Sequence, residues 1–190
     1  MWELDKKSGR WWSQQWGDAV FSDPVCPFAR GGNYAQYGTV CSWRWDGRTM
    51  LCKMDDREAN WDEGYPPPLQ LKLALKLPPI DPKVDDAFVC AALSNKTIFE
   101  GMRRKVLEPK LAEIAEMFEL KLFPRFSELK LSCNCDHDER PCLHLAALLA
   151  QMEDFLTERP LRIFTLIGSK LEYEFERHKF VPFPYYGNRV

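Results

Sequence analysis

The sequence lacks a strong excess of charge of either sign. Its 190 residues carry 26 lysines and arginines against 28 aspartates and glutamates, so the formal net charge at pH 7 is −2. A domain built mainly to hold nucleic acid usually has a clear basic excess. Any nucleic-acid surface is therefore expected to be local or shared with another subunit, and binding by the isolated chain is expected to be weak.

Long hydrophobic runs are also missing. No stretch approaches the roughly 18 consecutive apolar residues of a membrane span, and the first seven residues, MWELDKK, lack the apolar run of a signal peptide. We therefore expect no membrane partner and a cytoplasmic location, where thiols stay reduced. Seven cysteines, an odd number, then favour metal ligation and buried thiols over disulfides.

Sets of residues typical of enzymes are absent as well. The chain has three histidines, and it shows no glycine-rich phosphate loop with a lysine, no nucleophile-elbow serine and no pair of carboxylates flanked by ligand-like residues. We therefore expect no enzyme activity and assign no catalytic or cofactor-binding residue.

Tryptophan, by contrast, is abundant near the N-terminus. Four of the seven tryptophans, Trp2, Trp11, Trp12 and Trp16, fall within the first 16 residues. Trp12 and Trp16 lie four apart, as neighbours on a short helix would. Such rings mainly cover a core or a neighbouring subunit, and base stacking is the alternative. Because aromatic residues are enriched in interface cores, loss of Trp11 and Trp12 is expected to weaken assembly with a protein partner.

Alternating patterns predict a small antiparallel sheet. Residues 37–45 alternate Tyr, Thr, Cys, Trp and Trp with Gly, Val, Ser and Arg, and residues 69–77 alternate leucine with mainly polar residues. Asp46-Gly47 is typical of a tight hairpin turn, with residues 49–54 as the returning strand. The same alternation predicts two more strands, over residues 129–133 and 170–176.

Spacings of three and four predict helices between and after these strands. They cover residues 85–93, a segment from Glu108 onward with Leu111, Ile114 and Phe118 on one face, and residues 145–156, which end before Pro160. The fold class is therefore α+β, a small antiparallel sheet plus helices. We divide the chain into an aromatic N-terminal segment (1–33), a sheet and helical region (34–118), a zinc finger (119–160) and a C-terminal segment that packs on the core (161–190).

Four residues of metal-ligand type lie close together in the sequence: Cys133, Cys135, Cys142 and His144. Zinc is commonly held in a tetrahedron of thiolates and imidazole. A strand end would present the first two cysteines on one face, and Pro141 would direct the returning loop. The first turn of the next helix would then carry Cys142 and His144. Four protein ligands leave no position for water, so the pattern predicts one structural zinc ion.

Other candidate residues have alternative interpretations. His137, inside the loop, is an alternative zinc ligand, although a solvated position among the acidic loop residues Asp136, Asp138 and Glu139 is favoured. The remaining cysteines are expected to be buried free thiols, with a second metal site or a disulfide as the alternative: Cys26, Cys41, Cys52 and Cys90. The basic run at residues 103–105 could meet phosphates, but nearby glutamates favour a solvated turn.

The cysteine–histidine motif resembles the SWIM zinc finger, whose pattern is Cys-x-Cys, a variable gap and Cys-x-His on a strand–strand–helix unit. Other stretches resemble the bacterial SWIM-domain proteins found beside SWI/SNF-type helicases: residues 30–40 (RGGNYAQYGTV), Tyr65-Pro66, residues 122–124 (LFP), and Pro160-Leu161 with Gly168. The resemblance spans residues 28–170 and is closest at the finger. Leu143 replaces a residue that is often basic in the family, and the loop is acidic; both differences argue against phosphate contact by the finger.

This resemblance implies binding of DNA or protein. We therefore expect a non-catalytic zinc-finger adaptor, or a subunit of a larger nucleic-acid-associated assembly, that uses protein–protein contacts beside an ATP-driven, helicase-like partner. The alternative is a direct DNA- or RNA-binding protein, with Arg30 and residues 103–105 as its contacts.

Overall fold

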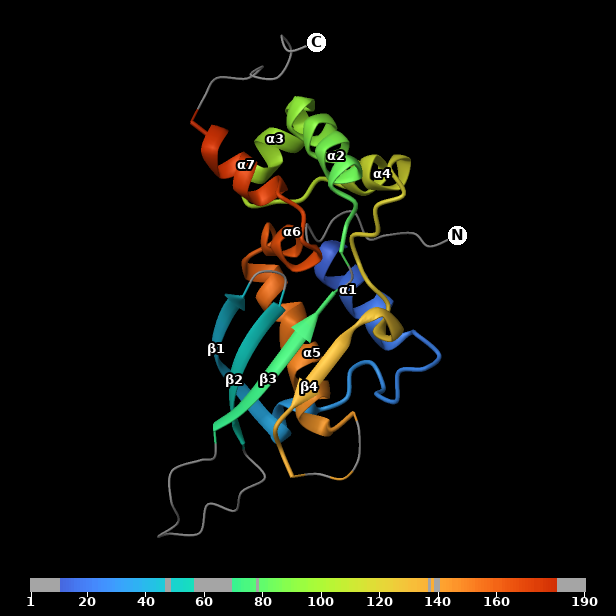
Figure 1. Ribbon diagram of the computed structural model, residues 1–190, viewed down its shortest axis with the longest axis vertical. Coiled ribbons are helices and arrows are strands. Elements are labelled where there is room, and N and C mark those ends of the chain that lie inside the picture. The colour runs from blue at the N-terminus through green and yellow to red at the C-terminus, as the bar shows by residue number, and fades with distance from the viewer. Residues whose placement is uncertain are drawn as a thin grey trace. The chain divides into compact units, whose positions relative to one another are not determined.

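The computed structural model describes residues 11–46, 49–56, 70–77, 79–136, 138 and 141–180. Their fold is α+β, with a four-stranded antiparallel sheet and seven α-helices (Figure 1). Contacts divide the chain into two compact units, each built from separate stretches of sequence. The sheet unit comprises Trp16–Leu77 and Pro124–Phe155, and the helical unit comprises Met1–Gln15, Pro78–Phe123 and Leu156–Val190.

The sheet has the order β1-β2-β3-β4, and each neighbouring pair is antiparallel. Its strands are β1 (Gly38–Asp46), β2 (Thr49–Asp56), β3 (Gln70–Lys76) and β4 (Lys130–Cys133). One face is apolar and buried, and its side chains come mainly from β2 and β3: Met50, Cys52, Met54, Leu71, Leu73 and Leu75. The strands expected from alternation at residues 37–45, 49–54, 69–77 and 129–133 are thus confirmed, while Gly47 of the expected turn lies outside the described residues.

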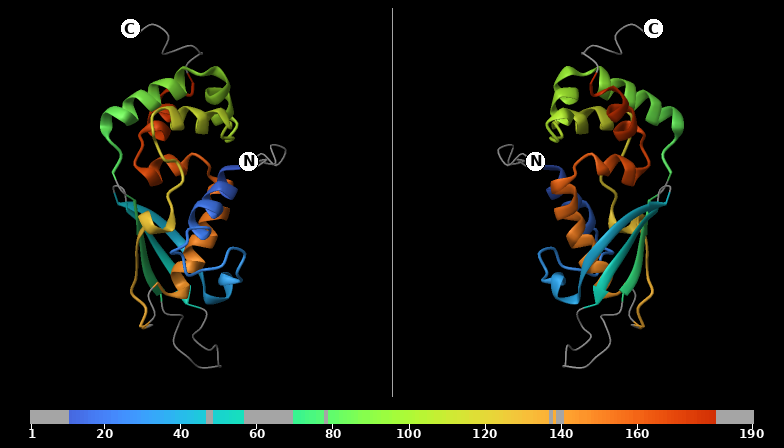
Figure 2. Two further views of the ribbon diagram at one scale, coloured as in Figure 1. Left: turned by 90° about the vertical axis from the view of Figure 1, so that its right-hand side faces the viewer. Right: turned by 90° about the vertical axis from the view of Figure 1, so that its left-hand side faces the viewer.

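Helix α5 (Leu143–Glu158) covers this buried face (Figure 2). The Trp43 ring of β1 stacks on Phe155, with ring centroids 4.6 Å apart. The Gln151 side chain accepts a hydrogen bond from the Val40 amide and donates one to the Gly38 carbonyl. The helix ends two residues before Pro160, as proline requires. Strand β1 is thereby attached to the helix by both packing and hydrogen bonds.

A β-bulge at Cys41 changes which side chains of β1 face inward. Val40 pairs with Met54, and Ser42 pairs with Lys53, so Cys41 is the extra residue. Because opposite residues share a face, Val40 lies on the inner side with Trp43. The alternation of residues 37–45 had grouped Cys41 with Trp43, and that assignment is wrong for the residues before the bulge, because a bulge shifts the period by one.

Helix α1 (Trp11–Phe21) buries the N-terminal tryptophans that the structure describes. Trp11, Trp12 and Trp16 are at most 5% exposed. Within the helical unit, the indole N–H groups of Trp11 and Trp12 donate to the Leu107 and Leu156 carbonyls. Within the sheet unit, Trp16 donates to the Leu149 carbonyl at 3.1 Å. The helical spacing is therefore confirmed, but these rings belong to the protein's own core and are not exposed for base stacking or for a partner. Trp2 lies outside the described residues.

The described part of the helical unit contains five complete helices. They are α2 (Pro82–Ser94), α3 (Lys96–Arg103), α4 (Lys110–Met117), α6 (Arg162–Ile167) and α7 (Leu171–His178). Asp81 caps α2 by accepting a bond from the Lys83 amide, and Asn95 caps α3 by accepting one from Ile98. Aromatic pairs hold the unit together, namely Phe88 with Phe164 and Phe99 with Phe175. Two short 3-10 helices, η1 (Tyr34–Tyr37) and η2 (Phe126–Glu128), belong to the sheet unit.

The strand expected over residues 170–176 is wrong, because this segment is helix α7. Leu171 and Phe175, four apart, are buried, whereas Tyr173 between them is 63% exposed. The start of the helix is fixed by Ser169 Oγ, which accepts from the Leu171 amide, and by Asp85, which accepts from the Lys170 amide. Alternating Glu and apolar residues fit both the period of a strand and that of a helix. The two hydrogen bonds at the start of the segment favour the helix.

In the part of the chain described, no helix combines the length and apolar character needed to cross a membrane.

Candidate metal centre

The four expected ligands meet where β4 leads through a loop into α5. Cys133 is the last residue of β4, Cys142 directly precedes α5, and His144 lies in the first helical turn. The ligand atoms of these residues and of Cys135 all lie within 4.8 Å of one another. Among the described residues this is the only group of such side chains placed to hold a metal ion. The expectation that these four residues, up to eleven apart in sequence, converge on one point is met.

The local geometry differs in detail from the sequence expectation. Cys135 lies in the loop after β4, and not on the strand itself. Cys142 precedes the helix, and its carbonyl accepts bonds from the Leu145 and Ala146 amides, as the residue before a first helical turn does. Between residues 119 and 160 the described residues contain a single strand, β4, whose neighbour is β3 from far earlier in the chain. The strand–strand–helix arrangement of the SWIM finger is thus matched only if β3, from earlier in the chain, is counted as the second strand.

Asn134, between the first two cysteines, holds the loop in place and was missed at the sequence level. Its side-chain oxygen accepts a hydrogen bond from the Lys72 amide at 2.6 Å, and its amide donates to the Lys72 carbonyl at 3.3 Å. Strand pairing is thereby extended one residue beyond Cys133, which pairs with Leu73. Asparagine favours turns and bonds to backbone, and this was the available signal.

The donor set fits a closed tetrahedral metal site. Zn–S bonds of about 2.3 Å place the sulfurs of a tetrahedron about 3.8 Å apart, and the observed spread of at most 4.8 Å accommodates one ion. Cys135, Cys142 and His144 are buried, and Cys133 is half-buried. Three sulfurs and one imidazole nitrogen are a common set for zinc, so the cluster is compatible with one zinc ion.

The contacts within the cluster also change the pKa values of its thiols. The Cys133 thiol, and then the His144 side chain, lower the pKa of Cys142 against the opposing effect of burial. The same contact with Cys142, together with burial, raises the pKa of Cys133. The contact between the two sulfurs therefore favours ionisation of Cys142, with Cys133 keeping the proton. A divalent cation would replace that shared proton, since it stabilises every ligating sulfur as thiolate.

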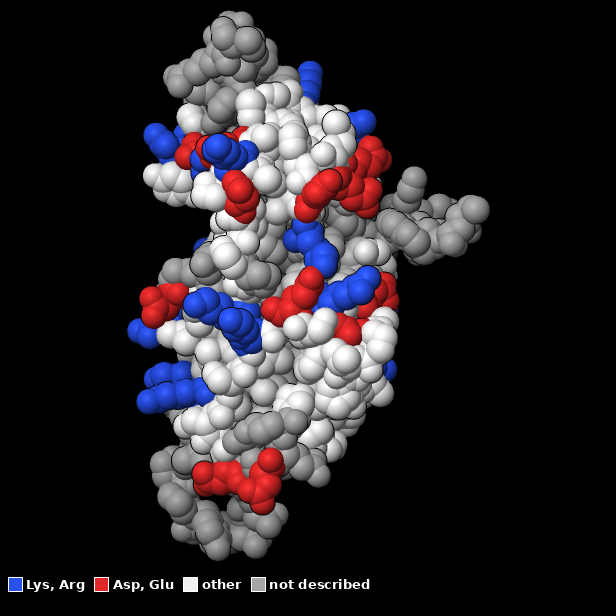
Figure 3. Space-filling view, turned by 45° about the vertical axis from the view of Figure 1, so that its right-hand side comes forward, with Lys and Arg blue, Asp and Glu red and all other residues white. Residues whose placement is uncertain are grey.

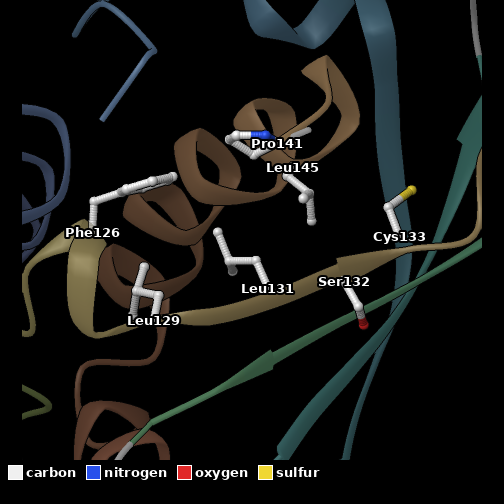
Figure 4. A pocket seen from close by; sticks show the side chains of 7 residues that line it. All are labelled: Phe126, Leu129, Leu131, Ser132, Cys133, Pro141 and Leu145. Carbon is white, nitrogen blue, oxygen red and sulfur yellow. The ribbon is translucent and has the colours of Figure 1, made fainter. Parts of the chain in front are cut away.

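A pocket of about 420 Å³ lies beside Cys133, between β4 and the start of α5 (Figure 4). Its other lining residues are mainly apolar: Phe126, Leu129, Leu131, Ser132, Pro141 and Leu145. Among the described residues of this lining, Cys133 is the only titratable one, and it belongs to the metal cluster.

The other cysteines differ from one another. All are free thiols, but Cys52 alone is buried, whereas Cys26 is half-buried and Cys41 and Cys90 are exposed. Burial raises the pKa of Cys52 to about 12, so this thiol is unreactive. The expectation of buried free thiols is thus confirmed for Cys52 and wrong for Cys41 and Cys90. Cys41 is exposed because it is the bulged residue of the edge strand β1.

The three arginines expected as nucleic-acid contacts, Arg30, Arg103 and Arg104, are paired with acids. Arg30 forms ion pairs with Asp18 and Glu153. Arg103 ends α3 and lies 3.3 Å from Glu100, and Arg104 lies 3.1 Å from Glu108. The expected solvated, glutamate-paired turn at residues 103–105 matches these contacts. In the acidic loop Asp136 and Asp138 are exposed, whereas His137, Glu139 and Arg140 lie outside the described residues.

Comparisons of this chain with protein-family models, with curated proteins and with solved structures found no match.

Proposed function

We propose that this chain is a non-catalytic, zinc-stabilised subunit or adaptor of a larger, nucleic-acid-associated assembly, in which it contacts a protein partner such as an ATP-driven, helicase-like protein. The observation that carries the proposal is the convergence of Cys133, Cys135, Cys142 and His144 within 4.8 Å at the junction of β4 and α5. A site closed by four protein ligands has no position for a substrate or a reactive water, which favours a structural role.

The assembly part of the proposal comes from the resemblance to SWIM zinc fingers, which is closest at these four residues. Direct binding of DNA or RNA is the second candidate. Of the contacts expected for it, Arg30, Arg103 and Arg104 lie beside carboxylates. Those carboxylates weaken the attraction of the three arginines for phosphate, which favours a contact through other cations.

The proposal is tested by metal analysis combined with affinity purification. We expect about one zinc ion per chain in protein purified without added metal. In native extract, the tagged chain should recover a protein partner, and nuclease treatment should not release that partner. Protein with no zinc would contradict the structural-metal proposal, and recovery of partners only through nuclease-sensitive nucleic acid would favour the second candidate.

A further inference from the structure

The outer face of the sheet, opposite α5, is open and basic. Side chains that alternate with the buried ones point to this face, and five exposed cations lie on it, a set termed here the basic sheet face: Arg44, Lys53, Lys72, Lys76 and Lys130. In Figure 3 several basic side chains lie on the left, at the height of the strands of Figure 1, with one acidic group beside the upper ones. Although the net charge of the chain is negative, this face is therefore locally positive.

Strand register places cations of this face directly opposite one another. Lys53 pairs with Lys72 across β2 and β3, and Lys76 pairs with Lys130 across β3 and β4. Like charges directly opposite on one face destabilise a sheet. None of the five cations forms an ion pair with an acidic residue of the described ranges. The folded sheet thus carries repulsion that a bound anion would relieve.

Among the described residues, the acidic side chains of this face lie at its two ends, where Asp46 shares a cross-strand row with Thr49, Lys76 and Lys130. Asp46 is the last residue of β1, and Asp55 pairs with Thr39 near the far end of β2. Between them lies a depression of about 470 Å³, lined by Ser42, Arg44, Leu51, Cys52, Lys53, Lys72 and Leu73. The three cations and the hydroxyl of this lining are groups that donate hydrogen bonds to phosphate oxygens.

The spacing of the cations favours an extended polyanion over a single ion. Lys72 and Lys76 are four residues apart on β3, which at about 3.3 Å per residue separates the two lysine pairs by about 13 Å. One phosphate reaches only one of these pairs, whereas a phosphodiester backbone carries charge continuously along its length.

The composition of the face distinguishes between classes of polyanion. Its apolar side chains are small or half-buried, such as Leu51 and Ala74, and the β1 tryptophans Trp43 and Trp45 pair with buried residues of the opposite face. Protein interfaces enrich aromatic residues and deplete lysine, so an acidic protein is a poorer match. The described residues of this face offer no ring for base stacking, which favours contact with phosphates.

We propose that the basic sheet face binds duplex nucleic acid through its phosphate backbone, without sequence preference. This inference rests on the nucleic-acid association in the proposed function, but it uses a surface separate from the metal ligands. It replaces Arg30 and residues 103–105 as the contacts of a directly binding protein.

The test is a titration of the full chain with a short labelled duplex DNA from about 50 to about 200 mM salt. The sheet variant carries Lys53→Gln, Lys72→Gln, Lys76→Gln and Lys130→Gln. The matched control removes the same charge from exposed lysines of the helical unit: Lys83→Gln, Lys96→Gln, Lys110→Gln and Lys121→Gln. We expect the wild type to bind with a Kd of about 10⁻⁴ to 10⁻⁶ M at physiological salt.

The sheet variant should bind at least about tenfold more weakly at low salt, and its salt slope should fall by about 0.9 per lost phosphate contact. The control should stay within about twofold of the wild type. Because repulsion is relieved, the melting temperature of the sheet variant should equal or exceed that of the wild type. The two pair variants, Lys53→Gln with Lys72→Gln and Lys76→Gln with Lys130→Gln, should each give about half of the slope change.

The inference would be overturned if the sheet variant and the control lost equal affinity for duplex DNA, or if the sheet variant kept the wild-type affinity. It would also be overturned if the wild type bound poly-glutamate more tightly than duplex DNA. Lost binding together with a lowered melting temperature in every lysine variant would also count against it. Failure of the proposed function is read separately, from metal content and partner recovery. The lysine variants retain all four metal ligands and should keep their zinc.

Discussion

Single residues of the same type have different roles in this protein because their surroundings differ. Cys142 lies 2% exposed among three other metal-ligand side chains, whereas Cys90 is exposed on α2. The thiol at position 142 is shifted toward thiolate by Cys133 and His144. Ligand spacing in the sequence, Cys-x-Cys and Cys-x-His, was sufficient to identify this cluster. The isolated cysteines carried no such pattern, and their exposure depended on register and packing.

Replacing Cys142 by serine should therefore remove both metal and stability. Loss of a structural metal is among the few single changes that cost about 4 kcal/mol or more, which for a chain of this size lowers the melting temperature by roughly 8–16 °C. Cys90→Ser, matched in chemistry, should change neither metal content nor melting by more than about 2 °C. Metal analysis and thermal unfolding of both proteins measure this. A Cys142→Ser protein that keeps its zinc and melts like the wild type would show that the ligand assignment is wrong.

Helices and strands are predictable from sequence where the apolar residues follow one clear period. They are not predictable where the same residues fit the periods of both a helix and a strand. Leucine alternation over residues 69–77 identified β3, and the stripe over residues 145–156 identified α5. Residues 170–176 fit a strand equally well, and the hydrogen bonds that Asp85 and Ser169 accept from the Lys170 and Leu171 amides favour a helix. The bulge at Cys41 depends on pairing with β2. Asp85 and β2 are distant in sequence from the residues that they affect, so neither leaves a local signal.

Asp23 links two such distant elements, the loop after α1 and the 3-10 helix η2. Its carboxylate accepts from the amide and the hydroxyl of Ser127, at 3.0 and 2.7 Å, and from the Val25 amide at 3.2 Å. The bonds from Ser127 are the main cause that lowers the pKa of Asp23. The ionised form is therefore the one that the folded state stabilises.

Stability supplied by Asp23 should depend on pH with a definite sign. Its folded-state pKa lies below the unfolded value of about 3.9, so the contribution is complete above that value and is lost as pH falls through the lowered folded-state pKa. Asp23→Asn should thus be less stable than the wild type at pH 7, and the difference should shrink under acid. Denaturant unfolding across pH measures it, with Asp154→Asn, which removes an exposed carboxylate of α5, as the control. A difference that is independent of pH would exclude the carboxylate charge as its cause.

At the scale of the whole molecule, the metal cluster and the sheet core belong to one compact unit. β4 carries Cys133 and pairs with β3, and α5 carries His144 and buries the inner face of the sheet. Metal ligation therefore fixes the two elements that enclose the core of the sheet unit. In the helical unit, aromatic pairs such as Phe88 with Phe164 form a core that contains no ligand residue. Metal ligation would thus stabilise the core of the sheet unit. The described core of the helical unit is stabilised by side-chain packing.

Removal of zinc should consequently loosen the two units unequally. Protons compete with the metal for thiolates and for His144, so stability from ligation is present at neutral pH and is lost as pH falls toward and below the histidine reference of about 6.5, sooner when a chelator is added. Hydrogen exchange after long incubation with chelator should accelerate first in β3, β4 and the first turns of α5, and later or not at all in α2. Released zinc, followed with a colorimetric indicator, should rise in step with that exchange. Uniform acceleration across both units, or full zinc retention under strong chelation at low pH, would contradict the assignment of the metal to the core of the sheet unit.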